Sequence, residues 1–347
     1  MRRMIARALV ALGACGWFAL AVAQSPAVDA READAAKAQV EQQKAQPLNN
    51  EPVWKEVRSG IPMYTSLPGR ETNVLLQSSG QTWRALRNGQ LSVWGGWVLL
   101  AVVLAIALYY WRKGSIPLQG APTGRKVLRF STAERIIHWA TAIAFVVLAV
   151  SGLVILFGKN LLLPIIGYTL FSWLAILAKN LHNFVGPVFV VCTFLMFFAF
   201  VKDNVWQKGD GVWIRKAGGL VTGGHVPSHR FNFGEKTWFW FGVVFLGIVV
   251  GASGLVLNFP NFDQTRATMQ IANVIHLTAT VIFMCLALGH IYMGTIGVAG
   301  AYDSMRTGYV DETWAKEHHE YWYNDIKSGK AGARGDAAAP AMQHGTA

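Results

Sequence analysis

Five long apolar segments constrain the fold of this 347-residue chain more than any other feature. They lie near residues 93–111, 136–157, 182–201, 238–258 and 271–296. Each approaches the roughly 20 residues that an α-helix needs to cross the hydrocarbon core of a bilayer. The charged fraction is only 14% and the hydrophobic fraction is 53%, which excludes an ordinary soluble domain. The sequence therefore predicts an all-α integral membrane protein, built as a transmembrane helix bundle.

A sixth apolar piece, residues 161–177, is shorter than the other five. It contains Pro164 and Gly167, which both interrupt helices. We expect this piece to form an interfacial or re-entrant element. A sixth transmembrane span is the alternative.

The N-terminus has the pattern of a secretory signal peptide. Its first residues include several arginines, an apolar run extends from Ala8 to Val22, and small residues precede a cleavage site after Ala23. Residues 1–23 are therefore predicted to be a signal peptide. The alternative is an uncleaved anchor helix, although Arg7 shortens the apolar run below spanning length.

Cleavage of the signal determines the orientation of the spans that follow. Residues 24–92 become an exported, periplasmic segment, and the span 93–111 must run into the cytoplasm. The loops 112–135 and 202–237 and the tail 298–347 are then cytoplasmic. The sequence thus predicts a multi-pass protein of the bacterial inner membrane, with a periplasmic mature N-terminus and a cytoplasmic C-terminus.

The basic residues agree with this orientation. The opposite, periplasmic connections contain only Lys159, Lys179 and Arg266. Membrane proteins concentrate Lys and Arg in cytoplasmic loops, so the distribution explains the formal net charge of +12 without a nucleic-acid partner. The two cytoplasmic loops contain Arg112, Lys113, Arg125, Lys126, Arg129, Arg135, Lys202, Lys208, Arg215, Lys216, Arg230 and Lys236.

Four histidines lie within the predicted spans: His138, His182, His276 and His290. In the predicted topology, His138 and His290 lie at cytoplasmic depth, whereas His182 and His276 lie toward the periplasm. Fourteen residues of helix rise about 21 Å and return to within about 40° of the starting direction, so His276 and His290 face the same side of one helix. Each can therefore meet a histidine of another helix, His276 with His182 and His290 with His138.

Paired imidazoles are suited to haem. Two neutral imidazoles occupy both axial positions of the iron, which then transfers electrons and does not activate oxygen. The pattern predicts two such haems stacked across the membrane. No C-x-x-C-H motif is present, so covalent c-type haem is not expected. Glycines near the histidines would let helix backbones approach a ring closely: Gly152, Gly186, Gly251 and Gly254.

Other roles for membrane histidines stay open at this point. A single histidine can hydrogen-bond across helices or lie at headgroup depth, and a haem-free structural anchor would use all four in this way. A zinc site is less favoured because no cysteine or carboxylate joins either pair. The spans contain no Asp or Glu for a proton relay. Five further histidines lie in polar segments and are expected at the surface: His225, His229, His318, His319 and His344.

Several longer motifs point to one family. The second span opens with ERIIHWATAIAFVVLAVSGL, and HRFNFGEKTWFW (229–240) is similar to R-[YF]-N-x-G-x-K-x-x-[FY]-W. The histidine spacing of fourteen, the tail TGYVDETWAKEHHEYWYNDI (307–326) and the exported GRETNVLLQSSGQTWRALRNG (69–89) complete the set. Together, over roughly residues 50–326, they resemble the gamma, or cytochrome b, subunit of membrane-bound respiratory formate dehydrogenase. Hydrogenase and thiosulfate-reductase cytochromes share the haem-helix pattern, so the conjunction of the motifs is what is specific.

The resemblance implies a four-helix di-haem core over residues 136–297, preceded by one extra span. His182 and His276 would bind the outer haem b, and His138 and His290 the inner one. Electrons would arrive from a periplasmic iron–sulfur beta subunit, itself served by a catalytic alpha subunit with molybdenum or tungsten. The chain has no ligands for those metals, so it is expected to be a non-catalytic electron-transfer subunit of anaerobic respiration. A cytochrome b of a hydrogenase or of another periplasmic dehydrogenase is the alternative.

The resemblance also implies a quinone site at the cytoplasmic end, for menaquinone or ubiquinone. Asn232 and Gly234 match the family's quinone-contacting positions, next to His290. Asparagine offers a donor to a quinone carbonyl, and glycine lets the ring approach the backbone. Without the resemblance, Asn232-Phe233-Gly234 would be interpreted as a turn before a helix.

Overall fold

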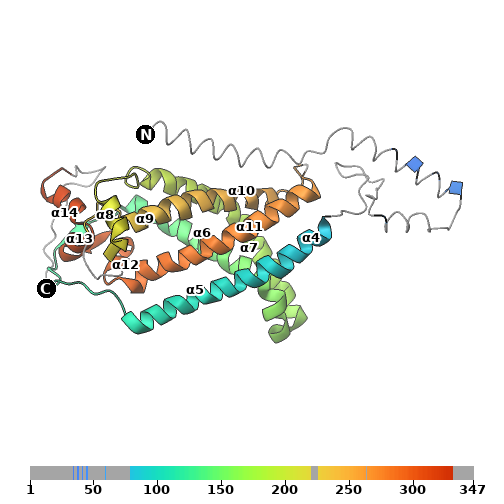
Figure 1. Ribbon diagram of the computed structural model, residues 1–347, viewed down its shortest axis with the longest axis horizontal. Coiled ribbons are helices and arrows are strands. Elements are labelled where there is room, and N and C mark those ends of the chain that lie inside the picture. Colours follow the sequence, from blue (N-terminus) through green and yellow to red (C-terminus); the bar gives the residue numbers. More distant parts are fainter. Residues whose placement is uncertain are drawn as a thin grey trace. The chain divides into compact units, whose positions relative to one another are not determined.

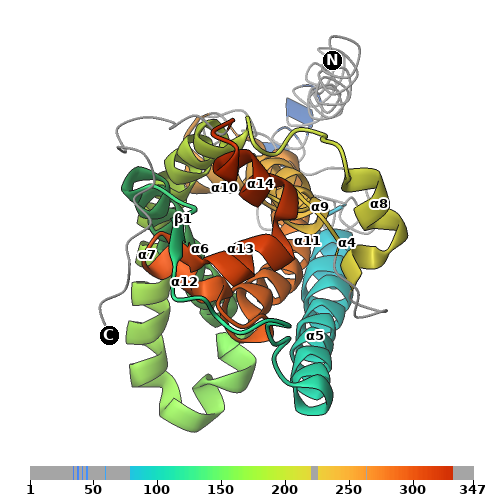
Figure 2. The same cartoon turned by 90° about the vertical axis from the view of Figure 1, so that its left-hand side faces the viewer.

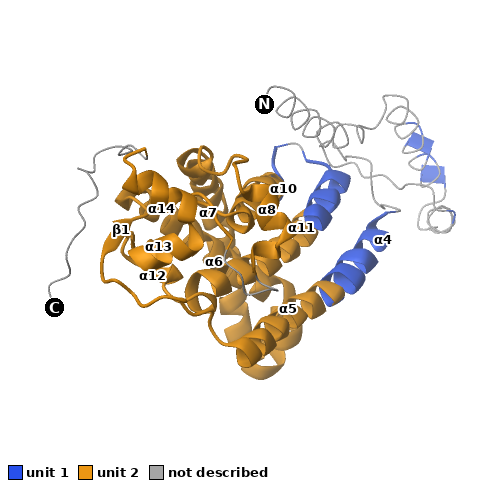
Figure 3. Ribbon diagram, turned by 60° about the vertical axis from the view of Figure 1, so that its left-hand side comes forward, with its two compact units in different colours: residues 1–93, 256–275 blue, residues 94–255, 276–347 orange. Residues whose placement is uncertain are grey.

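The computed structural model describes residues 79–219, 226–262 and 264–330, with a few isolated positions before residue 60 (Figure 1). The predicted signal peptide, residues 1–23, and most of the predicted exported segment lie outside the described residues. The chain forms two compact units, which Figure 3 colours separately. Unit 1 contains residues 1–93 and 256–275, and unit 2 contains residues 94–255 and 276–347.

Five helical segments of the described chain are long and apolar enough to cross a membrane. The prediction of an all-α membrane protein with five spans is therefore confirmed. The helices are longer than the apolar segments because hydropathy detects only their central part. The five are Gly80–Lys113, Thr132–Leu161, Leu163–Phe200, Phe233–Asn258 and Arg266–Gly297.

Three of the spans contain a π-helical segment. The first span consists of α4 (Gly80–Ala85), η1 (Leu86–Leu91) and α5 (Ser92–Lys113). The second is α6 (Thr132–Leu161) and the third is α7 (Leu163–Phe200). The fourth consists of α9 (Phe233–Thr237), η3 (Trp238–Leu246) and α10 (Gly247–Asn258), and the fifth of α11 (Arg266–Tyr292) and η4 (Met293–Gly297).

The apolar piece 161–177 is not a sixth span among the described residues. Leu161 ends α6, and residues 163–177 belong to α7, which is kinked within this piece. Its interfacial or re-entrant position stays a prediction. The helix is broken at one residue, Gly167 (φ 75°, ψ 172°), a conformation that favours glycine. Pro164 lies in the first turn of α7, where its missing N–H breaks no helical hydrogen bond.

The extra first span packs alongside the core within unit 2. A Cβ atom on Gly95 would lie 3.1 Å from Val281 of α11, and one on Gly96 would lie 3.2 Å from Phe157 of α6. At the far end of α5, Tyr109 and Tyr110 each place their ring centre 6.3 Å from that of Tyr292. In unit 1, Arg87 Nε donates to Asn273 Oδ1 at 3.3 Å.

A small cap gathers at one end of unit 2, as Figures 1 and 2 show. It consists of β1 (Lys126–Leu128), α12 (Ala301–Arg306), β2 (Tyr309–Asp311), α13 (Glu312–His318) and α14 (Glu320–Lys327). The strands are antiparallel, with Val127 opposite Val310. The sequence analysis predicted helices alone, since three-residue strands are too short to show a period-two pattern.

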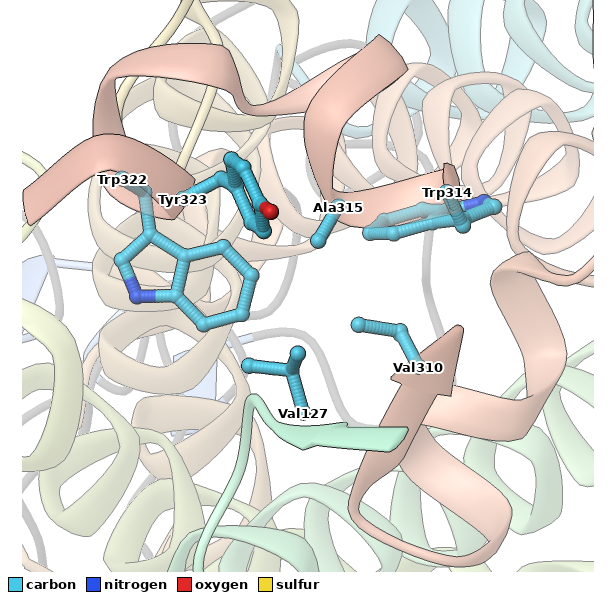
Figure 4. Close-up of a cluster of buried hydrophobic side chains, with 6 residues drawn as sticks. All are labelled: Val127, Val310, Trp314, Ala315, Trp322 and Tyr323. Atoms are coloured by element: carbon cyan, nitrogen blue, oxygen red, sulfur yellow. The ribbon is translucent and has the colours of Figure 1, made fainter. Parts of the chain in front are cut away.

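The cap has its own hydrophobic core, drawn in Figure 4. Ala315 and Val310 are almost fully buried, and Trp314 is 3% exposed. Asp311 ends β2 and caps α13, because its carboxylate accepts a hydrogen bond from Thr313 N at 2.9 Å. The cluster consists of Val127, Val310, Trp314, Ala315, Trp322 and Tyr323. The tail is thereby joined to the loop that precedes α6.

Candidate functional site

Inside unit 2, four histidines form two pairs, and the two rings of each pair face each other. The rings of His182 (α7) and His276 (α11) have centres 6.2 Å apart, with their planes at 78°. The rings of His138 (α6) and His290 (α11) have centres 6.3 Å apart, at 62°. The structure thus brings together the same partners that depth in the membrane predicts. We call them the outer pair and the inner pair.

A layer of three phenylalanines separates the two pairs. Phe145, Phe189 and Phe283 each follow one of the histidines by seven residues, which is close to two helical turns, and so they lie on the same helix faces. The ring centre of Phe145 lies 4.9 Å from that of Phe283 and 6.1 Å from that of Phe189. Phe189 and Phe283 are each 4% exposed. The space between the pairs is therefore packed with apolar rings.

Serine hydroxyls hold the outer pair. His276 Nδ1 lies 3.1 Å from Val250 O and 3.1 Å from Ser253 Oγ. A carbonyl can only accept, so Nδ1 carries the proton and Nε2 keeps its lone pair. His182 Nδ1 lies 2.9 Å from Ser151 Oγ, whose own hydroxyl donates to Val147 O at 2.7 Å. Both outer imidazoles thus present Nε2 as a ligand atom.

A glycine follows each of these serines and makes room for the imidazole. A Cβ atom on Gly152 would lie 3.3 Å from His182 Cε1, and one on Gly254 would lie 3.1 Å from His276 Cε1. The tetrapeptide Ser-Gly-Leu-Val occurs at 151–154 and again at 253–256, so the two helices offer equivalent cradles. The sequence analysis named both glycines but missed the serines, which this repeat could have revealed. Gly251 instead packs against Val190, and Gly186 faces no atom within 4 Å.

The inner pair is held differently. His138 Nδ1 is buried and has no hydrogen-bond partner among the described residues. His290 forms no side-chain hydrogen bond with the residues that the structure describes, and its ring stacks on the indole of Trp238 at 4.7 Å and 12°. Packing rather than hydrogen bonding therefore orients the inner imidazoles.

The spacing within both pairs fits an iron atom between two imidazoles. A ring nitrogen binds a metal at about 2.0–2.1 Å, and the ring centre lies about 1 Å behind it, so two opposed imidazoles have centres about 6 Å apart. The observed 6.2 and 6.3 Å agree with this value. The hydrogen bonds at Nδ1 of the outer pair match the way that ligand histidines are usually oriented.

Asn232 and Gly234 have local structural roles. Asn232 Oδ1 accepts from Glu235 N at 3.0 Å and Glu235 Oε2 accepts from Asn232 N at 2.8 Å, which makes a capping box for α9. A Cβ atom on Gly234 would lie 2.9 Å from Trp213 Cη2, so in this structure an indole uses the space that glycine leaves. The interpretation as a turn before a helix therefore describes the local backbone. The Asn232 amide nitrogen is left as a donor.

A comparison with known proteins decides the family. The model described as prokaryotic cytochrome b561 matches residues 129–308, a stretch that includes all four paired histidines. The chain belongs to the prokaryotic cytochrome b561 family. Haem b is the cofactor that this membership implies.

The similar proteins include cytochrome b subunits of formate dehydrogenases. The cytochrome b556(fdo) subunit of Escherichia coli K12 is 33% identical over 205 residues, which cover 58% of this chain and 93% of that protein. The nitrate-inducible cytochrome b556(Fdn) subunit of the same organism is 27% identical over 218 residues, covering 60% and 94%. The cytochrome b556 subunit of Haemophilus influenzae is 25% identical over 219 residues, covering 58% and 83%. The predicted resemblance to formate dehydrogenase cytochrome b subunits is confirmed.

The motif HRFNFGEK builds a buried ionic network between the cap and the bundle. Arg230 donates to Glu134 Oε2 at 2.8 Å and to Asp203 Oδ2 at 2.6 Å. Arg129 donates to Glu235 Oε1 at 2.8 Å and is 5% exposed. Arg129, Arg230 and Lys236 were interpreted as topological charges, whereas the structure buries Arg129 and Lys236, and half-buries Arg230, against carboxylates. Lys236, for example, is 3% exposed and lies 2.8 Å from Asp210.

His319 corrects the prediction of a surface role. It is only 1% exposed, with Nδ1 2.7 Å from His229 O and 3.1 Å from Ser228 Oγ. Its Nε2 lies 3.9 Å from Glu235 Oε2, at the edge of the ionic network. The pKa of His319 falls from 6.5 to about 3, first because burial disfavours the charged form and then because Arg129 is near. His225 and His344 lie outside the described residues.

Burial of neutral His319 makes the stability of the cap depend on pH. The folded pKa is lower than the unfolded one, so the unfolded chain binds a proton first, and stability is lost as pH falls from 6.5 toward 3. We expect the hydrogen-exchange protection of α13 and α14 to fall by up to about tenfold per pH unit below pH 6.5. His319→Gln should lower protection but flatten this slope. An equal pH dependence of protection in the parent and in His319→Gln would contradict the assignment of this dependence to His319.

Proposed function

We propose that this chain is the cytochrome b subunit of a formate dehydrogenase and carries electrons through two b haems to quinone. The facing histidines are the observation that supports this most directly. His182 and His276 would hold the outer haem, and His138 and His290 the inner one. Bound in this way, haem iron has no open position and supplies one-electron transfer alone.

The chain's own residues would position and insulate the two sites. The Ser-Gly cradles turn the outer imidazoles so that they present Nε2. The layer of Phe145, Phe189 and Phe283 excludes water between the pairs, which keeps the path dry and rigid. The fourteen residues from His276 to His290 separate the two pairs by about 21 Å of helix rise. That distance divides one crossing of the membrane into two shorter steps.

The exposed charges support the proposed orientation. Eight basic residues of the predicted cytoplasmic loops are exposed, against three in the opposite connections. We therefore infer an inner-membrane protein whose mature N-terminus is periplasmic and whose cap is cytoplasmic. The eight are Arg112, Lys113, Arg125, Lys126, Lys202, Lys208, Arg215 and Lys216, and the three are Lys159, Lys179 and Arg266.

The named relatives favour formate dehydrogenase over a hydrogenase or another dehydrogenase as the parent complex. The proposed partners are an iron–sulfur beta subunit and a molybdenum or tungsten alpha subunit in the periplasm. A haem-free anchor is disfavoured by membership of a cytochrome family.

The quinone site would lie where α9 begins, near His290. The Asn232 amide nitrogen forms no hydrogen bond with the described residues after Oδ1 has capped α9, and Trp238, one and a half turns later, reaches the His290 ring. A quinone carbonyl could accept from that amide. Trp213 would have to move from Gly234 for a ring to approach the backbone there.

The number of haems tests the function directly. The purified complex should contain two b haems in this chain, measured as the pyridine haemochrome. His276→Leu and His290→Leu should each reduce the count from two to one and remove different spectral components. His229→Leu, which changes a histidine outside the pairs, should keep two. Two haems in both ligand variants, or none in the parent, would contradict the proposal.

Single cysteines test the orientation. Asn160 and Ser328 are both exposed, on opposite sides of the proposed membrane. In intact cells with a permeable outer membrane, an impermeant maleimide should label Asn160→Cys but reach Ser328→Cys only after lysis. The parent chain, with Cys192 and Cys285 in its spans, gives the background. The reverse pattern would invert the topology.

A pair of substitutions separates the two roles of Asn232. Asn232→Asp keeps an oxygen that caps α9 but removes the amide donor, whereas Asn232→Ala removes both. If the amide binds quinone, Asn232→Asp should slow the oxidation of the reduced haems by quinone. One lost hydrogen bond should lower this rate by up to about tenfold. If only Asn232→Ala slows the oxidation of the haems, Asn232 acts only as the cap of α9.

A further inference from the structure

The two histidine pairs need different devices to fix the angle of their rings. Hydrogen bonds to Ser151 and Ser253 fix the outer rings, but His138 Nδ1 has no hydrogen-bond partner in the part of the chain that the structure describes. From this difference we infer that Trp238 is the positioning residue of the inner site and sets the ring angle of His290 through a stacked indole. This inference rests on the proposed haem ligation.

The contact has the geometry of an offset stack. The ring centres of Trp238 and His290 lie 4.7 Å apart with planes at 12°, within the range in which flat rings attract. An indole face of this kind resists rotation of the imidazole, because turning the ring would break the parallel contact. A single apolar side chain without a flat face would pack against the ring at many angles.

The surroundings of Trp238 hold the indole in place. Its ring lies over Gly242, one helical turn later, where a Cβ atom would lie 2.6 Å from Trp238 Cζ3. On another side, the Phe283 ring centre lies 5.8 Å from that of the indole. Trp238 is also the first residue of the π-helical turn η3, and such turns often redirect side chains at functional sites. The indole is therefore fixed independently of His290.

The ring angle matters for electron transfer. The planes of the two axial imidazoles determine how their orbitals overlap with those of the iron, and so influence both its potential and its electron paramagnetic resonance (EPR) spectrum. The observed angles differ, at 62° for the inner pair and 78° for the outer pair. A freed His290 ring would change the inner haem and leave the outer one unaltered.

The test uses EPR of the oxidised complex together with a redox titration. The parent should show two low-spin ferric signals, and His290→Leu identifies the inner one by removing it. Trp238→Leu should move the largest g value and the midpoint potential of the inner haem alone. Trp238→Phe, which keeps a flat ring, should restore both toward the parent. Trp240→Leu is the matched control, since the Trp240 indole instead donates to Asn204 O.

The outcomes separate this inference from the proposed function. Loss of the inner haem in Trp238→Leu with retention in Trp238→Phe supports the positioning role. An unchanged inner signal in Trp238→Leu overturns it, and so does loss of that haem in both variants. An equal shift in the g values and midpoint potentials of both haems also overturns it. No low-spin b haem in the parent would instead refute the proposed ligation.

Discussion

The structure depends on one constraint, which is that an imidazole placed in hydrocarbon must have a partner. An unpaired polar group inside a bilayer costs several kcal/mol, so the ring nitrogens of His276 and His290 on α11 favour a bound group, as the proposed haems would be. Their spacing of fourteen residues points both rings to one side, and α7 and α6 each supply a facing histidine there. The positions of the phenylalanine layer follow from the same helical period.

Different contacts hold the imidazoles at the two ends of the bundle. The outer end uses hydrogen bonds between helices, where serine hydroxyls and a backbone carbonyl of one helix hold the imidazole of the next. The inner end uses aromatic packing. A partly buried ionic network joins the residue after β1 to α9 and the residues before α9 to α6. The cap contacts α6 directly, since Trp139 Nε1 donates to Met305 O of α12 at 3.0 Å.

Much of the fold could be predicted from the sequence because hydropathy and helical period act locally. The five spans and the matching of histidines by depth need only lengths and spacings. Features that depend on contacts between distant parts of the chain could not be predicted from the sequence. The burial of His319 and the pairing of Arg230 with Asp203 and Glu134 require the tail and two loops to meet. Hydropathy and Gly167 do mark the kink in α7, but they do not show that residues 168–177 continue into the third span as one helix.

The most direct measurement of the central claim is an electron cryo-microscopy map of the purified complex in lipid. The account predicts two flat densities inside this chain, one bonded to His182 and His276 and the other to His138 and His290. It further predicts that the indole of Trp238 lies against His290 in the loaded protein. Direct contact within either pair, or a haem held by other residues, would contradict it.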